Sequence, residues 1–137
     1  PKTDTYTQYS FLRPIFFLVS STKTFQEKYQ ENLVKSIADY HGFRLADLVA
    51  YNNKHNEANG EANTDGTGHN YSWNCGVEGV TEDSRVLTLR MQQMKNALSL
   101  VLLGQGTPYI FMGDEMGSSQ SGNNNPYNQD NEISWLD

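Results

Sequence analysis

The sequence predicts an α/β fold, in which helices alternate with buried parallel strands. Three observations support it: an amphipathic helical pattern over residues 81–103, an apolar run over residues 109–112, and the acids Asp114 and Glu115 just beyond that run. A short apolar run between turn signals is typical of a strand buried on both faces. A helix leading into such a strand, with carboxylates at the strand exit, is the arrangement of a (β/α) barrel, whose active sites lie at the C-terminal ends of the strands.

The helix over residues 81–103 has the clearest pattern in the chain. Thr81 or Asp83 is suited to cap its N-terminus, and Gly104, Gly106 and Pro108 end it. One face repeats apolar residues at the spacing of a helix that packs on a core. These residues are Leu87, Met91, Met94, Leu98 and Val101. We therefore expect this stripe, including both methionines, to be buried.

The remaining segments predict shorter elements. Residues 15–19 are β-branched and aromatic, which favours a buried strand. Residues 25–38 carry apolar residues near helical spacing, whereas residues 33–40 are equally compatible with a strand. Residues 44–53 predict a short helix, and the segment 117–137, rich in Gly, Asn and Ser, predicts a loop on the active face.

Composition limits the class of protein. The chain has 137 residues, of which 36% are hydrophobic, and this allows one domain with a modest core. A net charge of −6 and a pI of about 4.9 argue against a nucleic-acid partner. The apolar run 11–19 contains Arg13 and Pro14 and is too short to span a membrane, so no membrane association is expected. The single cysteine, Cys75, excludes an intrachain disulfide and favours a cytoplasmic location.

The segment 55–79 (HNEANGEANTDGTGHNYSWNCGVEG) is a long polar loop that also contains Tyr71 and Trp73. Long irregular loops in compact domains are usually functional or disordered, and large aromatic residues favour function. Amides and carboxylates bind sugar hydroxyls, while aromatic rings stack on the apolar face of a sugar. The loop therefore predicts a sugar-binding surface.

The same loop also has part of the spacing of a calcium site. Glu61, Asn63, Asp65 and Gly66 occupy positions 1, 3, 5 and 6 of an EF-hand loop, but Ser72 stands where a bidentate Glu is needed. No flanking helices are evident. We therefore expect neither a metal ion nor a cofactor.

Five segments, in unbroken order, carry a resemblance to a known family. They are GFRLADLV at 42–49, YNNKHNEANGEANTDG at 51–66, SWNCGVEG at 72–79, GTPYIFMGDE at 106–115 and GNNNPYNQDNEISWLD at 122–137. Together they resemble the glycogen-debranching and isoamylase branch of the α-amylase superfamily (glycoside hydrolase family 13). The fourth segment is similar to the final barrel strand of the wider superfamily, whereas the third and fifth are similar to the debranching branch in particular.

The resemblance implies a partial (β/α)8 barrel, made of the last two strand–helix units with long loops. On this basis residues 1–40 form a divergent N-terminal segment, and residues 41–137 form the C-terminal portion of a catalytic barrel. The resemblance further implies hydrolysis of α-1,6 branch linkages in glycogen or branched maltodextrin by a retaining mechanism. In that mechanism one carboxylate attacks the sugar and a second protonates the leaving oxygen, and in the family an Asp steadies the distorted ring.

The chain departs from the family at its catalytic acids. The nucleophile and the acid/base belong to the fourth and fifth strands of a barrel of about 250 residues, which have no counterpart here. Where the family has His-Asp-Gly-Phe, this chain has Tyr40-His41-Gly42-Phe43. Without a gap His41 replaces the Asp; with a one-residue deletion His41 is the family's His and the Asp is missing. Asp39 lies about 6.6 Å back along an extended chain, too far to substitute.

We therefore expect a fragment of a debranching hydrolase that is inactive alone, or a non-catalytic α-glucan-binding or interaction module derived from that family. His41 is the candidate for the catalytic position, with a structural His as the alternative. Uncovered barrel edges favour self-association. The candidate substrate-binding residues are Tyr40, Asn56, Glu57, Trp73, Asp114 and Glu115, although Trp73 equally fits a loop anchor and the last two equally fit bracing of neighbouring loops.

Overall fold

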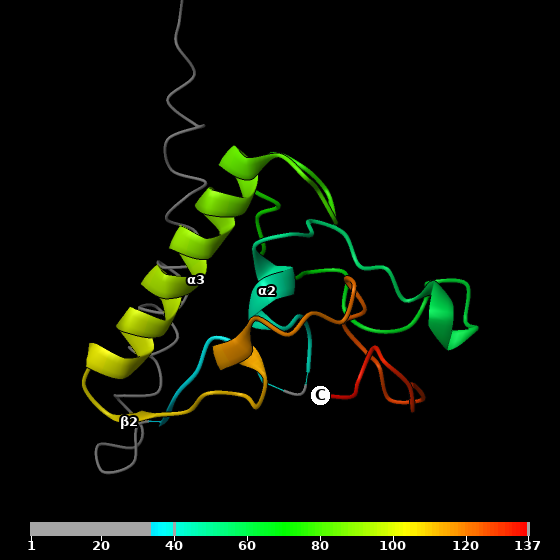
Figure 1. Cartoon of the computed structure of the whole chain (residues 1–137). Helices are drawn as coiled ribbons and strands as arrows, with labels where there is room; N and C mark the ends of the chain where they lie inside the picture. Colours follow the sequence, from blue (N-terminus) through cyan, green and yellow to red (C-terminus); the bar gives the residue numbers. More distant parts are fainter. Residues whose placement is uncertain (1–33, 40, 137) are drawn as a thin grey trace, which may run out of the picture.

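The computed structural model describes residues 34–39 and 41–136 (Figure 1). The predicted strand 15–19 and Tyr40 lie outside these residues. The elements, in chain order, are β1 (Val34–Lys35), α2 (Leu45–Leu48), η2 (Glu57–Asn59), α3 (Ser84–Leu103), β2 (Thr107–Pro108) and η3 (Asp114–Met116), where η denotes a 3-10 helix. Two parallel strands with helices between them in the chain confirm the α/β class.

β1 and β2 pair in parallel, with Val34 opposite Thr107 and Lys35 opposite Pro108. The backbone N–H of Tyr109 extends this pairing by donating to the Lys35 carbonyl at 2.8 Å. The strand alternative for residues 33–40 is met only at Val34–Lys35, and the helix predicted over 25–38 is wrong for its described part, 34–38. Pairing with β1, rather than the apolar run itself, decides where the second strand forms.

The strand predicted at 109–112 is therefore wrong in its bounds and in its burial. β2 covers Thr107–Pro108, and Tyr109, Ile110 and Met112 are exposed. An apolar run becomes a buried strand only where neighbouring strands and helices cover it. Among the described residues β1 is the only strand beside β2, and the pairing is only two residues long.

α3 confirms the helix predicted over residues 81–103, although it begins three residues later, at Ser84. The Asp83 side chain caps its N-terminus by accepting a hydrogen bond from the N–H of Arg85 at 2.9 Å, and the helix ends at Gly104. Lys35 ties the helix end to β1, because its buried Nζ donates to the carbonyls of Val101, at 2.8 Å, and of Gly104. A cation at this end of a helix is favourable.

The apolar stripe predicted for α3 is buried only in part. Val101 is buried, but Leu87 is 46% and Met91 49% exposed. The buried residue near the middle of the helix is Arg90, whose guanidinium donates to the carbonyls of Gly79 (2.7 Å), Asn74 (3.1 Å) and Val77. Leu87 and Met91 lie about 60° and 100° around the helix from Arg90. The hydrogen bonds of Arg90, rather than the apolar stripe, orient this part of α3.

The described interior is more polar than apolar. The short helix α2, shorter than the predicted 44–53, packs near α3. The buried hydrophobic residues are Ala38, Phe43, Leu45, Tyr51, Cys75 and Val101. The buried polar residues are Lys35, Arg44, Asp47, Asn56, Asn59, Arg90, Asp114, Gln120, Asn123 and Asn124. Side-chain hydrogen bonds therefore hold much of the described structure together.

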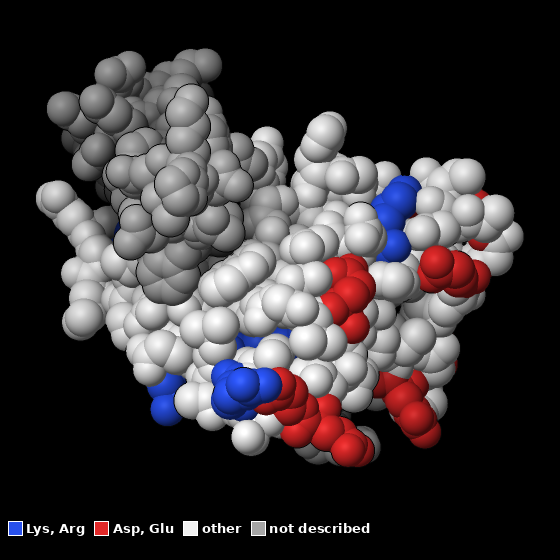
Figure 2. Space-filling view, turned by 90° about the horizontal axis from the view of Figure 1, so that it is seen from above, with Lys and Arg blue, Asp and Glu red and all other residues white. Residues whose placement is uncertain are grey.

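No helix within residues 34–39 and 41–136 is long and apolar enough to cross a membrane. Acidic side chains form several separate patches on the face shown in Figure 2, with few basic side chains between them. The described residues visible on that face form no continuous basic stripe.

Replacing Arg90 by Met is expected to lower the free energy of unfolding by about 3 kcal/mol, because several buried carbonyls lose their donor. Lys95→Met, at an exposed position of the same helix, is the matched control and is expected to change stability by less than about 0.5 kcal/mol. Urea unfolding followed by circular dichroism measures both. Equal effects of the two substitutions would contradict the role of Arg90.

Candidate functional site

Two long loops, one between α2 and α3 and one after η3, lie against each other. We name residues 51–79 the signature loop and residues 117–136 the tail loop. In Figure 1 the tail loop (orange to red) runs beside the signature loop (green). The N–H of His55 donates to the carbonyl of Gly122 at 2.7 Å. Gly122 has φ +77°, and a Cβ atom there would lie 2.7 Å from the Tyr51 ring, so the close approach of the loops requires glycine.

A buried network of amides joins the two loops. Asn56 (0% exposed) and Asn124 (3%) exchange two hydrogen bonds: Asn56 Nδ2 donates to Asn124 Oδ1 at 2.9 Å, and the N–H of Asn124 donates to Asn56 Oδ1 at 3.0 Å. Nearby, Asn123 Nδ2 donates to Asn59 Oδ1 at 2.9 Å. Asn59 Nδ2 in turn donates to Asp65 Oδ2 at 2.7 Å. This last bond is the main cause of a lowered pKa for the Asp65 carboxyl.

The network changes the interpretation of Asn56, which the sequence suggested as a glucan contact. Its side chain is fully buried and its amide atoms are committed to Asn124 and Asp65. The structure therefore assigns Asn56 to holding the loops together and gives no support to a direct sugar contact. Glu57, the next residue, is exposed at the start of η2.

Trp73 is half-buried, and its backbone N–H donates to the carbonyl of Leu48 at 2.9 Å. This bond attaches the signature loop to α2, while the packing of the Trp73 ring as a loop anchor stays a prediction. Its role in sugar stacking stays a prediction.

The two carboxylates that follow β2, Asp114 and Glu115, each accept a hydrogen bond from a backbone N–H group. Asp114 is buried, and its Oδ1 accepts a hydrogen bond from the N–H of Leu45 at 3.1 Å. Burial raises the pKa of the Asp114 carboxyl. Glu115 is exposed and accepts from the N–H of Gly113 at 2.9 Å. The Asp114 contact joins this turn to the start of α2, which fits the bracing alternative, whereas the Glu115 contact lies within its own turn.

Sequence reasoning missed two buried charged residues beside Asp114. Arg44 lies over the Phe111 ring, with its guanidinium carbon 4.1 Å from the ring centroid, and donates to the carbonyl of Met112 at 2.6 Å. Burial lowers the Arg44 pKa although acidic side chains lie nearby. Asp47 accepts hydrogen bonds from the N–H of Gln120, at 2.8 Å, and from the Ser119 hydroxyl, and burial raises its pKa. The sequence does hold a signal for both residues, because Arg44 and Asp47 are the two charged residues within the otherwise mostly apolar segment GFRLADLV.

Glu78 fixes the base of the signature loop. Its carboxylate accepts hydrogen bonds from the N–H groups of Asn52 and Asn53 and from Asn74 Nδ2, each at 2.9 to 3.0 Å, and lies 3.5 Å from His55 Nε2. Burial alone would raise the Glu78 pKa, but the hydrogen bonds together outweigh it and lower the pKa.

Three of the residues at EF-hand spacing use side-chain oxygens for hydrogen bonds within the loops. Glu61 accepts from the Tyr127 hydroxyl, Asn63 Oδ1 accepts from the N–H of Asn56 at 2.9 Å, and Asp65 accepts from amides. In the part of the chain that the structure describes, no group of three or more His, Cys, Asp or Glu side chains is placed to hold a metal ion.

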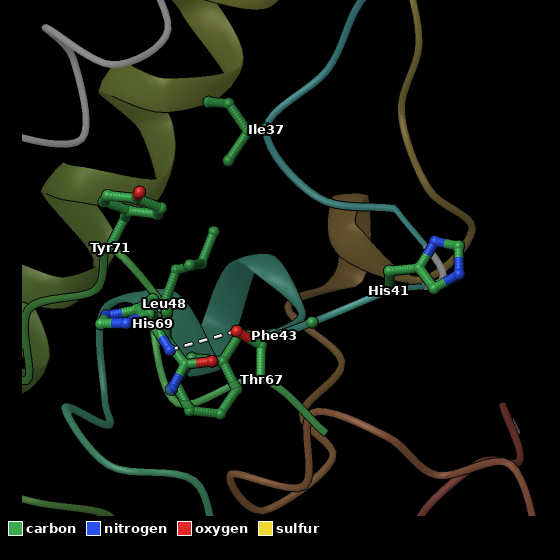
Figure 3. A pocket seen from close by; sticks show the side chains of 9 residues that line it. Ile37, His41, Phe43, Leu48, Thr67, His69 and Tyr71 are labelled. Carbon is green, nitrogen blue, oxygen red and sulfur yellow. Dashed lines mark hydrogen bonds between the residues drawn. The ribbon is translucent and has the colours of Figure 1, made fainter. Parts of the chain in front are cut away.

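His41 lies in the turn that follows β1, at the edge of a pocket of about 190 Å³. It is exposed, and its N–H donates to Asp39 Oδ1 at 2.7 Å, so the Asp39 carboxylate is part of this turn. The pocket is lined by Ile37, His41, Gly42, Phe43, Leu48, Thr67, His69, Asn70 and Tyr71. Figure 3 shows the His41 ring turned away from the group formed by Tyr71, His69 and Phe43.

The sequence is similar to those of several named proteins. No family model matches the chain. It is 55% identical over 104 residues to the glycogen operon protein GlgX homolog of Mycobacterium tuberculosis. It is 51% identical over 103 residues to isoamylase 1, chloroplastic, of Arabidopsis thaliana and 50% identical over 103 residues to the glycogen debranching enzyme of Pectobacterium carotovorum. These matches cover 75–76% of this chain but only 13–16% of the relatives, so the chain spans about one seventh of their length.

A double-mutant cycle tests the amide pair. Asn56→Ala and Asn124→Ala are each expected to destabilise the chain, and the double variant is expected to reveal a coupling of about 1–2 kcal/mol, because the two side chains satisfy each other. The control cycle pairs Asn56→Ala with Asn131→Ala, at an exposed position of the tail loop, and should be additive within about 0.5 kcal/mol. Similar coupling in both cycles would contradict a specific pair.

Stability should fall in acid through Glu78. A carboxyl whose pKa is lowered by folding stabilises the folded state above its unfolded pKa, near 4.5, and this contribution is lost as the pH falls through the lower folded value. At pH 7, Glu78→Gln should cost about 1–2 kcal/mol, since several donors lose a charged acceptor. The difference between parent and variant should shrink below about pH 4. A difference that is constant from pH 7 to pH 3 would show that the charge is not involved.

Proposed function

We propose that this chain, which belongs to the glycogen-debranching and isoamylase branch of the α-amylase superfamily, is a portion of the barrel of a debranching glycoside hydrolase. One observation carries the proposal: about half of the matched residues are identical to those of proteins named for glycogen debranching, although the chain spans only 13–16% of their length.

The fold supports a partial barrel. β1, α3 and β2 follow each other in the order strand, helix, parallel strand, which is the repeating unit of a (β/α)8 barrel. The turn at 41–43 and the segment at 111–114 then both follow strand C-termini, where a barrel carries its active site. On this proposal residues 41–137 are the C-terminal portion of the barrel, and residues 1–40 are a divergent segment.

The substrate proposed is a branched α-glucan, glycogen or branched maltodextrin, cleaved at α-1,6 linkages with retention of configuration. Such a reaction needs a carboxylate nucleophile and a carboxylic acid about 5 to 5.5 Å apart. The described carboxylates near the turn, Asp39, Asp47 and Asp114, are each held by hydrogen bonds within the fold. The chain is therefore proposed to be inactive alone, with His41 at or beside the position of the family's third acid. Glu57 and Trp73 remain the candidate sugar contacts of the signature loop.

A second candidate function is a non-catalytic α-glucan-binding module. The observation in its favour is that the amide network holds both loops using only residues of this chain. For either function a cytoplasmic location is proposed. Self-association through the exposed apolar residues that follow β2, Tyr109, Ile110 and Met112, is proposed as well.

A chimera tests the function and the two alignments of His41. A full-length debranching relative receives residues 41–136 of this chain in place of its corresponding region. The chimera, like the chain alone, is expected to release no reducing ends from glycogen. His41→Asp restores hydrolysis if the alignment has no gap, whereas insertion of Asp after His41 restores it if one residue is deleted. Either gain should be about 100-fold or more, the size expected for a positioned catalytic group.

His69→Asp, which places an Asp at another exposed His, is the control and should leave the chimera inactive. Hydrolysis by the unmodified chimera or by the chain alone would refute the loss of the third acid. Failure of both restored variants in a folded chimera would refute the proposed function of this region.

A further inference from the structure

We propose that Asn59, which Gly60 follows, is a site of spontaneous deamidation that the bound tail loop protects. Deamidation turns the Asn59 amide into a carboxylate, and this makes separation of the tail loop from the signature loop irreversible. Asn59–Gly60 is the one Asn-Gly pair in the 137 residues of the chain. The proposal concerns the two loops alone and does not depend on the debranching function.

The reaction needs only residues 59 and 60 and water. The backbone nitrogen of Gly60 attacks Cγ of Asn59, so that an N–Cγ bond forms and the Cγ–Nδ2 bond breaks. Ammonia leaves with the proton of the Gly60 nitrogen. Water then opens the five-membered imide, at the side-chain carbonyl to give Asp or at the main-chain carbonyl to give an isoaspartyl link. Glycine after Asn favours ring closure, because it has no Cβ to block the approach or to restrict the backbone.

The fold holds the attacking nitrogen in place. Gly60 ends η2 with φ +78°, and its N–H donates to the carbonyl of Glu57 at 3.1 Å. Ring closure requires this bond to break and the ψ angle of Asn59 to leave the value that a 3-10 helix imposes. A Cβ atom at residue 60 would meet nothing within 4 Å, so the left-handed backbone, rather than lack of space, favours glycine here.

Four hydrogen bonds hold the side chain of Asn59, which is 6% exposed. Its Nδ2 donates to Asp65 Oδ2 at 2.7 Å and to the Asn125 carbonyl at 2.8 Å. Its Oδ1 accepts from Asn123 Nδ2 and from Gln129 Nε2, both at 2.9 Å. Three of these four partners belong to the tail loop. When the tail loop leaves, the Asn59 side chain therefore loses most of what prevents its rotation.

The deamidated side chain no longer fits its site. A carboxylate at position 59 has no hydrogen to donate, yet it would face Asp65 Oδ2 and the Asn125 carbonyl, which both accept. The bond from Asn59 is the main cause of the lowered Asp65 pKa, so Asp65 is charged at neutral pH and repels a second carboxylate. An isoaspartyl link would also lengthen the main chain before Gly60. Either product opposes return of the tail loop.

Deamidation of Asn59 therefore reports how often the two loops separate. A reaction that proceeds only from an open state has a rate proportional to the population of that state. The buried pair of Asn56 and Asn124 holds the loops together without touching the Asn59 side chain. Weakening this pair should raise the open population while leaving the intrinsic reactivity of Asn59–Gly60 unchanged.

The first test measures deamidation of the whole chain at mildly alkaline pH, by mass spectrometry of proteolytic peptides. In the parent the reaction at Asn59 is expected to be at least about 10-fold slower in buffer than in urea that unfolds the chain. Asn124→Ala is expected to speed it at least about threefold in buffer and to leave the rate in urea unchanged. Asn53→Ala is the matched control, because Asn53 is exposed and bonds Glu78 through its backbone N–H. It should change neither rate.

Two further variants make the first test decisive. Gln129→Ala removes one tail-loop bond to Asn59 from a half-buried position. It is the milder opening variant and replaces Asn124→Ala if circular dichroism shows that variant to be unfolded. Gly60→Ala should slow deamidation at least about 10-fold even in urea, because the added Cβ hinders ring closure. Equal rates of the parent in buffer and urea, or opening variants that are folded but react no faster than the parent, overturn the protection by the tail loop.

The second test measures the effect of the product. Asn59→Asp reproduces the aspartyl product, and it is expected to lower the urea midpoint by about 1 M, since two donors are lost and a like charge is added. Adding Asp65→Asn should recover part of this loss by removing the repulsion. Asn131→Asp, at an exposed position of the tail loop, is the control and should leave the midpoint nearly unchanged. Equal midpoints for Asn59→Asp and Asn131→Asp overturn the irreversible step.

Discussion

Asn56 and Asn124 exchange two hydrogen bonds in a part of the molecule that water does not reach. A buried amide that loses its partner costs about 1–3 kcal/mol, so each of these side chains depends on the other being in place. Asn124 extends the dependence further, since it also contacts Gly42, Thr67 and Asn70. The turn after β1, the signature loop and the tail loop are therefore positioned together.

The same logic applies to the buried charges. Arg90, on α3, donates hydrogen bonds to carbonyls of the signature loop. Asp47, on α2, accepts hydrogen bonds from N–H and hydroxyl groups of the tail loop. Long irregular segments carry many backbone groups that no strand or helix satisfies, and each buried one needs a partner. Charged side chains meet this need with strong hydrogen bonds. A small apolar core is thus sufficient for loops of this length.

Local signals in the sequence were sufficient for α3, but they did not give the bounds of α2. The cap at Asp83, the glycine at 104 and the apolar spacing define α3 without reference to the rest of the chain. The second strand could not be placed in this way, because its position depends on pairing with β1 about 70 residues earlier. The buried face of α3 could not be predicted in this way either. The apolar stripe predicted that Leu87 and Met91 are buried, but the face that carries Arg90 is buried instead, because Arg90 binds carbonyls of the signature loop.

The candidate site was accessible from the sequence only in part. The turn at His41 and the signature loop were identified, and the structure brings the turn and residues 67–71 of that loop around one pocket. The sequence could not predict which asparagine side chains are buried, because Asn56 and Asn70 are the same residue type in similarly polar segments. Asn56 is buried against Asn124, whereas Asn70 lines the pocket. The difference is decided by the tail loop, which lies far away in the chain.

That distance in the chain has a kinetic consequence. The bonds that hold the loops connect residues far apart: 68 positions separate Asn56 from Asn124, 73 separate Asp47 from Gln120, and 69 separate Leu45 from Asp114. Chains dominated by such distant contacts fold slowly, because the entropy of closing the long loop is lost before the contacts compensate for it. During synthesis Asn56 and Asn59 of the signature loop lack their partners in the tail loop until residues 123–124 have emerged. This middle part of the loop is therefore expected to order late and to be exposed to proteases and to misassembly in the interval, whereas the end near Gly79 can already bind Arg90.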